Sequence, residues 1–206
     1  MPSSATDVPG LVCDFTGGAV LHRFRFGGGR GQALPRAVGM KAGKTPRVID
    51  ATAGLGRDAF LLASLGAEVT LIERSPVMHA LLHEGLTRAA LAGGAVAAVV
   101  GRMTLLAGDA RTVLPTLSAE VVLLDPMHPP RQKSALVKNE MRLLREIVGS
   151  DDDFPDLLRI ALQCASKRVV LKWPRRADPP QGVRPCSHQI LGKSTRFDVY
   201  MTGLGG

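Results

Sequence analysis

From residue 47 onward, short and almost uninterrupted apolar runs alternate with segments of helical character, and this alternation constrains the fold more than any other feature. The apolar runs lie at residues 47–52, 68–73, 103–107, 120–125 and 168–173. Such runs of Val, Leu and Ile are typical of strands buried on both faces, in a parallel sheet between layers of helices. Two further strand-like pieces follow at 187–191 and 196–201. We therefore expect an α/β fold with a mostly parallel, seven-stranded sheet.

Helix signals lie between these runs. Gly66 follows the helical pattern of residues 57–65, and glycine is common just past the end of a helix. Ser75 and Pro76 supply an N-cap and a first-turn proline for a helix that reaches about residue 91. Two more helices are expected at 135–148 and 154–165, between the fourth and the fifth strand.

Residues 1–46 are expected to form a small N-terminal extension. Residues 11–16 and 19–26 are strand-like, and the glycine pair between them suits a two-residue hairpin turn. A glycine-rich run at 27–31 and a short helix that ends near Gly43 follow. We therefore divide the chain into a hairpin and helix extension, residues 1–46, and a main domain, residues 47–206.

The chain is basic, with 26 Lys and Arg against 18 Asp and Glu and a net charge of +8. Two stretches without any acidic residue, 15–49 and 157–177, carry seven and six basic residues. A surface of this kind suits a polyanion, and nucleic acid is the first candidate. The basic residues that we expect to contact RNA are Arg23, Arg30, Arg131, Lys133, Lys172 and Arg175.

Other features narrow the class of protein. No apolar run approaches the roughly 20 residues that cross a bilayer, and the N-terminus lacks the basic start and apolar stretch of a signal peptide. Cys13, Cys164 and Cys186 are too few and too scattered for a disulfide framework or a zinc site. We therefore expect a cytoplasmic protein with reduced thiols, no membrane contact and no metal.

The first strand runs into the sequence D-A-T-A-G-L-G-R-D, residues 50–58. The glycines of such a strand-to-helix turn, here Gly54 and Gly56, let the backbone approach a ligand beside the partly positive helix start. Glu73 ends the next strand, where a carboxylate can accept both hydroxyls of a ribose. This spacing predicts a nucleoside-containing cofactor.

The details of the turn favour one cofactor over another. A dinucleotide-binding turn prefers G-x-G-x-x-G, but Thr52 or Ala53 occupies the place of the first glycine. S-adenosylmethionine (SAM) carries a sulfonium and an amino-acid end instead of phosphates, which suits the acid Asp50 at the tip of the first strand. Asp109 and Ala110, after the third strand, lie where an adenine-binding pair would be expected.

The fourth strand ends in L-L-D-P-M-H-P-P, residues 123–130, the most specific sequence in the chain. It resembles the D/N-P-P-aromatic signature of methyltransferases that modify amino groups. An exocyclic amine is a poor nucleophile because its lone pair is delocalised into the ring. A carboxylate and a prolyl carbonyl that accept its two N–H bonds return electron density to the nitrogen. Asp125 and the Pro126 carbonyl are the predicted acceptors, and His128 takes the place of the aromatic that stacks on the base.

Four segments are together similar to the family of ribosomal RNA small-subunit methyltransferase J. They are FGGGRGQALPRAVGMK, DATAGLGRDAFLLASLGAEVTLIERSP, LLDPMHPPRQKSALVKNEMRLLREIVG and KRVVLKWPRRA, and the resemblance spans residues 17–200. It implies the Rossmann-like class I methyltransferase fold, SAM as cofactor, and methylation of N2 of guanosine 1516 near the 3′ end of 16S rRNA, on free rRNA or on a 30S particle. The cofactor contacts that it implies are Arg57, Asp58, Glu73, Arg74, Asp109, Ala110 and Asp125.

Several alternatives stay open at this point. An NAD-dependent dehydrogenase is the first alternative class, although the missing glycine position of the turn and the D-P-M-H-P-P sequence disfavour it. A non-catalytic RNA-binding assembly factor would keep the fold but would need neither the turn nor Asp125. The amine could also belong to another nucleic acid or to a protein. Trp173, the only tryptophan, could stack on a base, and buried packing suits it at least as well.

Overall fold

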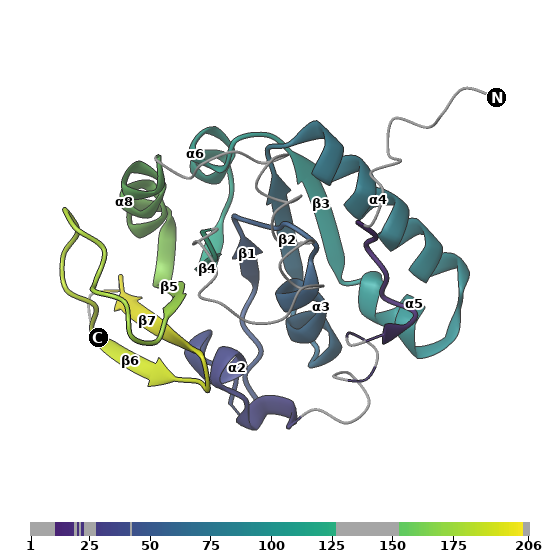
Figure 1. Cartoon of the computed structure of the whole chain (residues 1–206), viewed down its shortest axis with the longest axis horizontal. Coiled ribbons are helices and arrows are strands. Elements are labelled where there is room, and N and C mark those ends of the chain that lie inside the picture. Colours follow the sequence, from purple (N-terminus) through teal and green to yellow (C-terminus); the bar gives the residue numbers. More distant parts are fainter. Residues whose placement is uncertain are drawn as a thin grey trace.

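The computed structural model describes residues 11–18, 20, 22, 28–41, 43–126 and 153–203. These residues contain a seven-stranded sheet with the order β3-β2-β1-β4-β5-β7-β6. The five strands β1 to β5 are parallel, β7 is antiparallel to β5, and β6 is antiparallel to β7. Figure 1 shows the sheet through the middle of the molecule, with α4 beside β3 and α8 beside β5. The fold class expected from the sequence is confirmed.

Each strand predicted from residue 47 onward corresponds to an observed one. The strands are β1 (Val48–Asp50), β2 (Val69–Glu73), β3 (Met103–Ala107), β4 (Ala119–Leu124), β5 (Ala165–Pro174), β6 (His188–Leu191) and β7 (Thr195–Met201). The largest difference is in β5, which is longer at both ends than the apolar run at its centre because it pairs with both β4 and β7.

The helices of the described residues are η1 (Gly29–Gly31), α2 (Ala33–Ala37), α3 (Arg57–Ser64), α4 (Pro76–Leu91), α5 (Gly94–Val100), α6 (Ala110–Val113), η2 (Leu114–Thr116) and α8 (Phe154–Cys164). The helices predicted at 57–65, 76–91 and 154–165 are found, whereas the short helix α2 ends at Ala37 and not near Gly43 as predicted. The hydroxyl of Ser75 accepts a hydrogen bond from the backbone N–H of Met78 at 3.4 Å, so the predicted N-cap of α4 is confirmed. The helix predicted at 135–148 lies outside the described residues.

Both faces of the sheet are apolar, and successive residues of a strand contribute to opposite faces. Val48 and Val170 belong to one core cluster with residues of α3 and α4. Ile49 and Leu171, their neighbours in sequence, belong to a second cluster with residues of α6 and α8. This double burial is the reason that the strands are uninterrupted apolar runs.

The predicted N-terminal hairpin is not found in the described residues. Residues 11–14 have no regular structure, and residues 18, 20 and 22 are helical. The alternation that suggested a strand has another cause: Leu11, Cys13 and Phe15 are buried in the core, whereas Val12 is 61% exposed. An alternating pattern shows that one side of an extended segment is covered, but not whether a strand or a helix covers it.

Helices α3 and α4 cover this N-terminal segment. The ring of Phe15 stacks on that of Phe60 in α3, with centroids 5.0 Å apart. Arg88 of α4 donates a hydrogen bond to the carbonyl of Cys13 at 2.7 Å. At Gly85 of α4, a Cβ atom would lie 2.6 Å from the same carbonyl oxygen, so only glycine lets the segment pack this closely.

The boundary proposed between residues 46 and 47 stays a prediction. Leu34, Val38 and Met40 lie in the same core cluster as the buried residues of α3. Side chains from both sides of that boundary therefore share one apolar core. Among the described residues, no helix has the length and apolar character that crossing a bilayer requires.

Candidate active site

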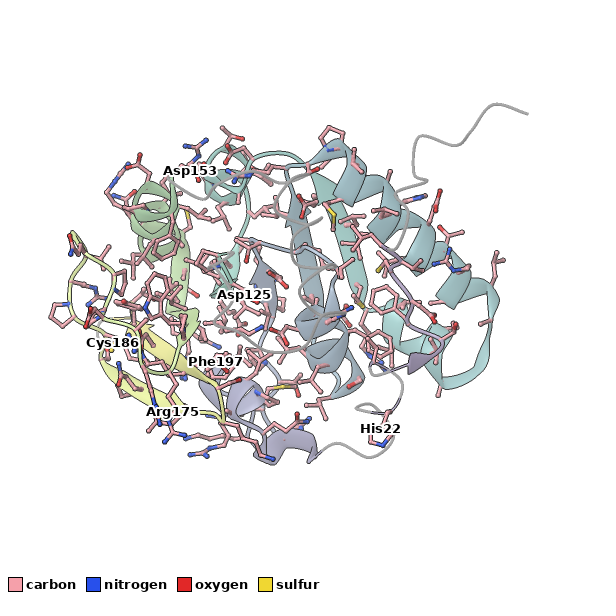
Figure 2. All side chains as sticks on the ribbon, viewed as in Figure 1. His22, Asp125, Asp153, Arg175, Cys186 and Phe197 are labelled. Carbon is pink, nitrogen blue, oxygen red and sulfur yellow. The ribbon has the colours of Figure 1, made fainter. Side chains whose placement is uncertain are left out.

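The strand order reverses between β1 and β4, because β1 pairs with β2 on one side and with β4 on the other. In open α/β sheets, ligands bind beyond the carboxyl ends of the strands at such a reversal. Asp50 and Glu73 are the last residues of β1 and β2, Asp125 directly follows β4, and Lys172 lies near the end of β5. Figure 2 shows Asp125 near the centre of the molecule, beside β1 and β4.

The turn after β1 depends on its two glycines. Gly54 and Gly56 have φ angles of 51° and 67°, in the left-handed region that favours glycine. A Cβ at Gly56 would lie 2.9 Å from Leu82 and 3.2 Å from Phe15, so this glycine also permits core packing. A Cβ at Gly54 would meet only a backbone oxygen at 4.0 Å, which leaves that side of the turn open to a ligand.

Glu73 supports this turn from the neighbouring strand. One carboxylate oxygen accepts the N–H of Gly54 at 3.0 Å, and the other accepts the N–H of Ser75 at 2.8 Å. The residue is only 5% exposed, and burial raises the pKa of its carboxyl against the opposing effect of these donors. Since a carboxylate oxygen has more than one lone pair, Glu73 retains acceptor capacity for a pair of hydroxyls.

Two carboxylates contact one lysine, and a third carboxyl, that of Asp50, is influenced by the charge of all three groups. The Nζ of Lys172 lies 2.7 Å from Asp58 Oδ2 and 2.6 Å from Asp125 Oδ2. Burial opposes the charge of Lys172, but these two carboxylates outweigh it and raise its pKa. Asp50 is 3% exposed, and burial, followed by repulsion from Asp58, raises the pKa of Asp50 to about 7.

The loop after β4 is tied to the loop after β1. The backbone N–H of Asp125 donates to the hydroxyl of Thr52 at 2.6 Å. The side chain of Asp125 is 39% exposed, whereas the following Pro126 is buried. Asp125 thus combines a fixed backbone with a carboxylate that solvent and substrate can reach.

A second group of charges lies beside this edge, between β2, α6 and α8. Arg74 donates to Asp153 at 2.7 Å, and Arg111 lies 3.2 Å from the same carboxylate. Figure 2 shows Asp153 near the ends of α6 and α8. Arg111 also binds both oxygens of Asp109, and this hydrogen bonding lowers the pKa of Asp109. Asp109 therefore already has a cationic partner at the position predicted to bind adenine, next to the buried Ala110.

The basic residues predicted to contact RNA have different surroundings. Arg30 donates to the carbonyls of Lys41 and Leu65 at 2.7 and 3.1 Å, so its guanidinium fastens η1 to neighbouring segments. Lys172 lies within the carboxylate cluster described above. Arg175 is exposed and donates to the carbonyl of Gly192 at 3.2 Å. Arg23, Arg131 and Lys133, together with His128, lie outside the described residues.

Trp173 packs in the core and does not face the site as a free ring. It is 9% exposed, its centroid lies 5.6 Å from that of Phe154, and its indole N–H donates to the carbonyl of Asp178 at 2.8 Å. The structure thereby favours packing over base stacking for this residue. The described part of the chain contains no cluster of His, Cys, Asp and Glu that could hold a metal ion.

The sequence did not reveal the role of Thr52, the ion pairs of Asp153, or the link of Lys172 to Asp58 and Asp125. Thr52 stands in a turn where only the glycines carry a known pattern. The contacts of Lys172 require that β5 lie beside β4, which follows from the sheet order. The sequence signal for these contacts is that Lys172 stands near the end of an otherwise apolar strand.

The arrangement fits a nucleoside that carries a positive charge. Glu73 can accept a ribose diol, the open side of Gly54 admits a ligand, and the cluster of Asp50, Asp58 and Asp125 favours a cation. These are the chemical features of SAM, whose sulfonium and ammonium are positive and whose nucleoside bears no phosphate.

Comparison with known proteins supports the same class. A family model described as a putative SAM-dependent methyltransferase matches residues 3–202. A SAM-dependent methyltransferase of Neisseria gonorrhoeae has a similar solved structure, with 37% sequence identity and a TM-score of 0.75. The similarity covers 95% of this chain and 76% of that protein. The fold and the site thus define a class I SAM-dependent methyltransferase.

More similar relatives specify the family. The ribosomal RNA small subunit methyltransferase J of Agrobacterium fabrum is 67% identical over 191 residues, which cover 93% of this chain and 92% of the relative. The protein of the same name from Brucella anthropi is 65% identical over 199 residues, 97% of each chain. The chain belongs to the ribosomal RNA small subunit methyltransferase J family.

Proposed function

We propose that this protein transfers the methyl group of SAM to the exocyclic N2 of one guanosine near the 3′ end of 16S rRNA. By the resemblance stated above, this nucleotide is guanosine 1516. The substrate class follows from the names of the relatives, which specify small-subunit ribosomal RNA. The observation that carries the choice of an amine is the reachable carboxylate of Asp125, followed by Pro126, at the switch point of the sheet.

SAM, when bound, supplies a methyl group activated by the positive sulfonium. The carboxylate of Asp125 accepts one N–H of the amine, and the carbonyl of Pro126 accepts the other. These bonds align the lone pair of the nitrogen with the methyl group, and alignment accounts for much of the rate in a displacement of this kind. The excess proton leaves to solvent after transfer, so no separate general base is needed. His128 completes the proposed catalytic group by stacking on the base.

The cofactor-binding group that we propose surrounds the turn after β1. Asp50, Gly54 and Gly56 belong to the turn itself, and Glu73 on the neighbouring strand accepts the ribose hydroxyls. The remaining members are Arg57, Asp58, Arg74, Asp109, Ala110 and Asp125. Asp109 is paired with Arg111. We propose that Asp109 accepts a hydrogen bond from the adenine amino group while it stays paired with Arg111.

The two acid-free basic stretches support an RNA-binding surface. They are adjacent in the fold, since Arg168 of β5 donates to the carbonyl of Ala37 in α2 at 3.3 Å, and α2 packs on β6 and β7. Arg36 of α2 and Arg175 after β5 are both exposed. We propose that RNA binds over this surface, with Arg23, Arg131 and Lys133 as further contacts. Binding to rRNA or to the small subunit would place the protein in the cytoplasm.

The experiment that tests this function is mass mapping of 16S rRNA from cells with and without the gene. We expect one methyl group, on the base of one guanosine near the 3′ end, to disappear without the gene and to return with the purified protein and SAM. An unchanged methylation pattern would refute the proposed substrate. Normal small-subunit binding without methyl transfer would support the assembly-factor alternative instead.

A further inference from the structure

Lys172 connects three segments that fold from distant parts of the sequence. Its Nζ, carried by β5, contacts Asp58 in the first turn of α3 and Asp125 after β4, at 2.7 and 2.6 Å. Asp58 belongs to the proposed cofactor-binding group, whereas Asp125 belongs to that group and also binds the substrate amine. One ammonium group therefore contacts both a cofactor-binding residue and the proposed substrate acceptor.

A second lysine on the same strand shows what an ordinary surface pair looks like. Lys167 pairs with Glu120 at 2.7 Å, but its side chain is 58% exposed. Such solvated pairs stabilise proteins by about 0–1 kcal/mol. The side chain of Lys172 is 25% exposed, and it serves two carboxylates, of which Asp58 is 15% exposed. Lys167 and Lys172 thus lie on the same strand and form ion pairs of similar length, but the side chain of Lys172 is much less exposed to solvent.

The carboxylates around Lys172 would repel one another without it. Among the described residues, the charged groups of this cluster include Asp50 from β1, Asp58 from α3, Asp125 after β4 and Lys172 from β5. Neighbouring negative charges favour the protonated form of a carboxyl, whereas an adjacent cation favours the ionised form. A protonated Asp125 would offer its own hydrogen to the amine and would lose acceptor capacity.

We propose that Lys172 is a positioning residue for methyl transfer, which keeps the Asp125 carboxylate ionised and oriented toward the substrate amine and links it to Asp58 of α3. The contact to Oδ2 of Asp125 and the bond from its N–H to Thr52 together fix this residue at its side chain and its backbone. This inference rests on the acceptor role proposed for Asp125. It replaces the RNA contact expected for Lys172 from the sequence, because an ammonium shared by two carboxylates is a poor partner for phosphate.

The first test measures the rate of methyl transfer as a function of pH. Lys172→Met, Lys172→Arg and the control Lys167→Met are compared in single turnovers, with saturating SAM and small subunits. We expect Lys172→Met to slow transfer at pH 7 by about 100-fold, the scale of a displaced reacting group. The acid limb of its pH profile should move upward by roughly one to three pH units. Lys172→Arg should restore the position of the acid limb, and Lys167→Met should match the wild type.

The second test needs no RNA and no turnover. Carbon-13 NMR titration of the aspartate carboxyl groups follows their ionisation in the same variants, with thermal unfolding as a check of folding. We expect the carboxyl resonance of Asp125 to titrate at higher pH in Lys172→Met and at the wild-type pH in Lys167→Met. An unchanged titration together with an unchanged acid limb would overturn the proposal. So would a reduced salt dependence of RNA binding in Lys172→Met with a normal pH profile, because it would identify a phosphate contact.

The two proposals fail in distinguishable ways. If the wild-type protein methylates neither rRNA nor small subunits, the proposed substrate is wrong. The NMR titration would still report whether Lys172 controls the ionisation of Asp125. If methylation is normal but the titration of Asp125 does not respond to Lys172, only the positioning role is wrong.

Discussion

Asp50 is a carboxylic acid buried at the tip of the central strand, and the energetic effect of its burial depends on pH. In the folded protein its pKa is about 7, against an ordinary value of 3.8. Between these pH values the folded state binds more protons at this group than the unfolded chain does. The stability that this group contributes is therefore present below about pH 4 and lost as the pH rises through about 7.

We therefore expect Asp50→Asn to be more stable than the wild type at pH 8, by on the order of 1–3 kcal/mol, with little difference at pH 4. Urea unfolding at the two pH values measures this. Asp156→Asn, at a side chain 64% exposed, serves as the control and should show no such dependence. A stability difference that is the same at both pH values would contradict the buried, proton-binding state of Asp50. SAM affinity should fall in Asp50→Asn because the cluster loses negative charge.

Glu73 is expected to hold the ribose of the cofactor. Glu73→Ala should weaken the binding of SAM and of its demethylated product by on the order of 2–4 kcal/mol, because charge-assisted hydrogen bonds are removed from a buried site. Calorimetry measures both affinities. Glu68→Ala, at an exposed position just before the same strand, is the matched control and should bind normally. If the wild type bound NAD but gave no heat with SAM or with its demethylated product, the assignment of Glu73 to the ribose of SAM would be wrong.

Asp125 is expected to act at the reaction centre and to contribute little to RNA affinity. Asp125→Ala should abolish turnover, whereas Asp125→Asn should keep partial activity because its amide oxygen still accepts a hydrogen bond. Phosphate contacts supply most of the affinity for RNA, so binding should change little. Single-turnover assays with Asp178→Ala as an exposed control measure this. A near-normal rate in Asp125→Ala would show that the acceptor lies elsewhere.

At the scale of elements, the sequence predicted the helices and strands that are marked by residues within the element or next to it. Ser75 and Pro76 marked the start of α4 to the residue, and each apolar run became a strand. The N-terminal segment was assigned wrongly because alternation does not identify the element that covers it. For the candidate site, the sequence predicted that Asp50, Glu73 and Asp125 end or follow strands, and the structure has them at these positions. The assembly of the site around Lys172 depends on which strands are neighbours, which no single segment encodes.

The N-terminal segment supports the cofactor turn, because Phe15 packs on α3 and lies close to Gly56. We expect Phe15→Ala to destabilise the protein by about 3–5 kcal/mol, as for other buried aromatic truncations. It should also weaken binding of the demethylated cofactor, since the turn loses its support. Val12→Ala, on the same segment but 61% exposed, should leave both properties unchanged. Chemical unfolding and calorimetry check the pair, and equal effects of the two substitutions would contradict this role.

At the scale of the whole molecule, the acidic site and the basic surface are separate. Asp50, Asp58 and Asp125 form the acidic centre, while Arg36 and Arg175 lie on the side of α2, β6 and β7. Figure 2 shows Arg175 on this side of the molecule, apart from Asp125. In the proposed function, this separation lets phosphates bind outside the site while a base, which carries no charge, enters it.

We expect Arg36→Glu/Arg175→Glu to weaken RNA binding and to leave cofactor affinity unchanged. For every phosphate that the variant no longer neutralises, the slope of log affinity against log salt should fall by roughly 0.7–0.9. Arg102→Glu, before the opposite edge strand β3, is the control and should keep the wild-type slope. Arg30 is left intact because its hydrogen bonds hold the fold. An unchanged slope in the double variant, for rRNA fragments and for whole small subunits, would refute the proposed surface.

The ion pairs of Asp153 have a consequence for cooperativity. Asp153 is the N-cap residue of α8, yet its carboxylate makes no capping hydrogen bond and binds Arg74 and Arg111 instead. Arg74 directly follows Glu73, so the ion pairs at the start of α8 begin one residue away from the carboxylate proposed to bind the ribose. A ligand that binds more tightly when the Arg74–Asp153 pair is formed would stabilise that pair and, with it, the position of Asp153 at the start of α8. Thermodynamic reciprocity then requires that a partner bound at α8 alter cofactor affinity by the same factor as the cofactor alters affinity for that partner.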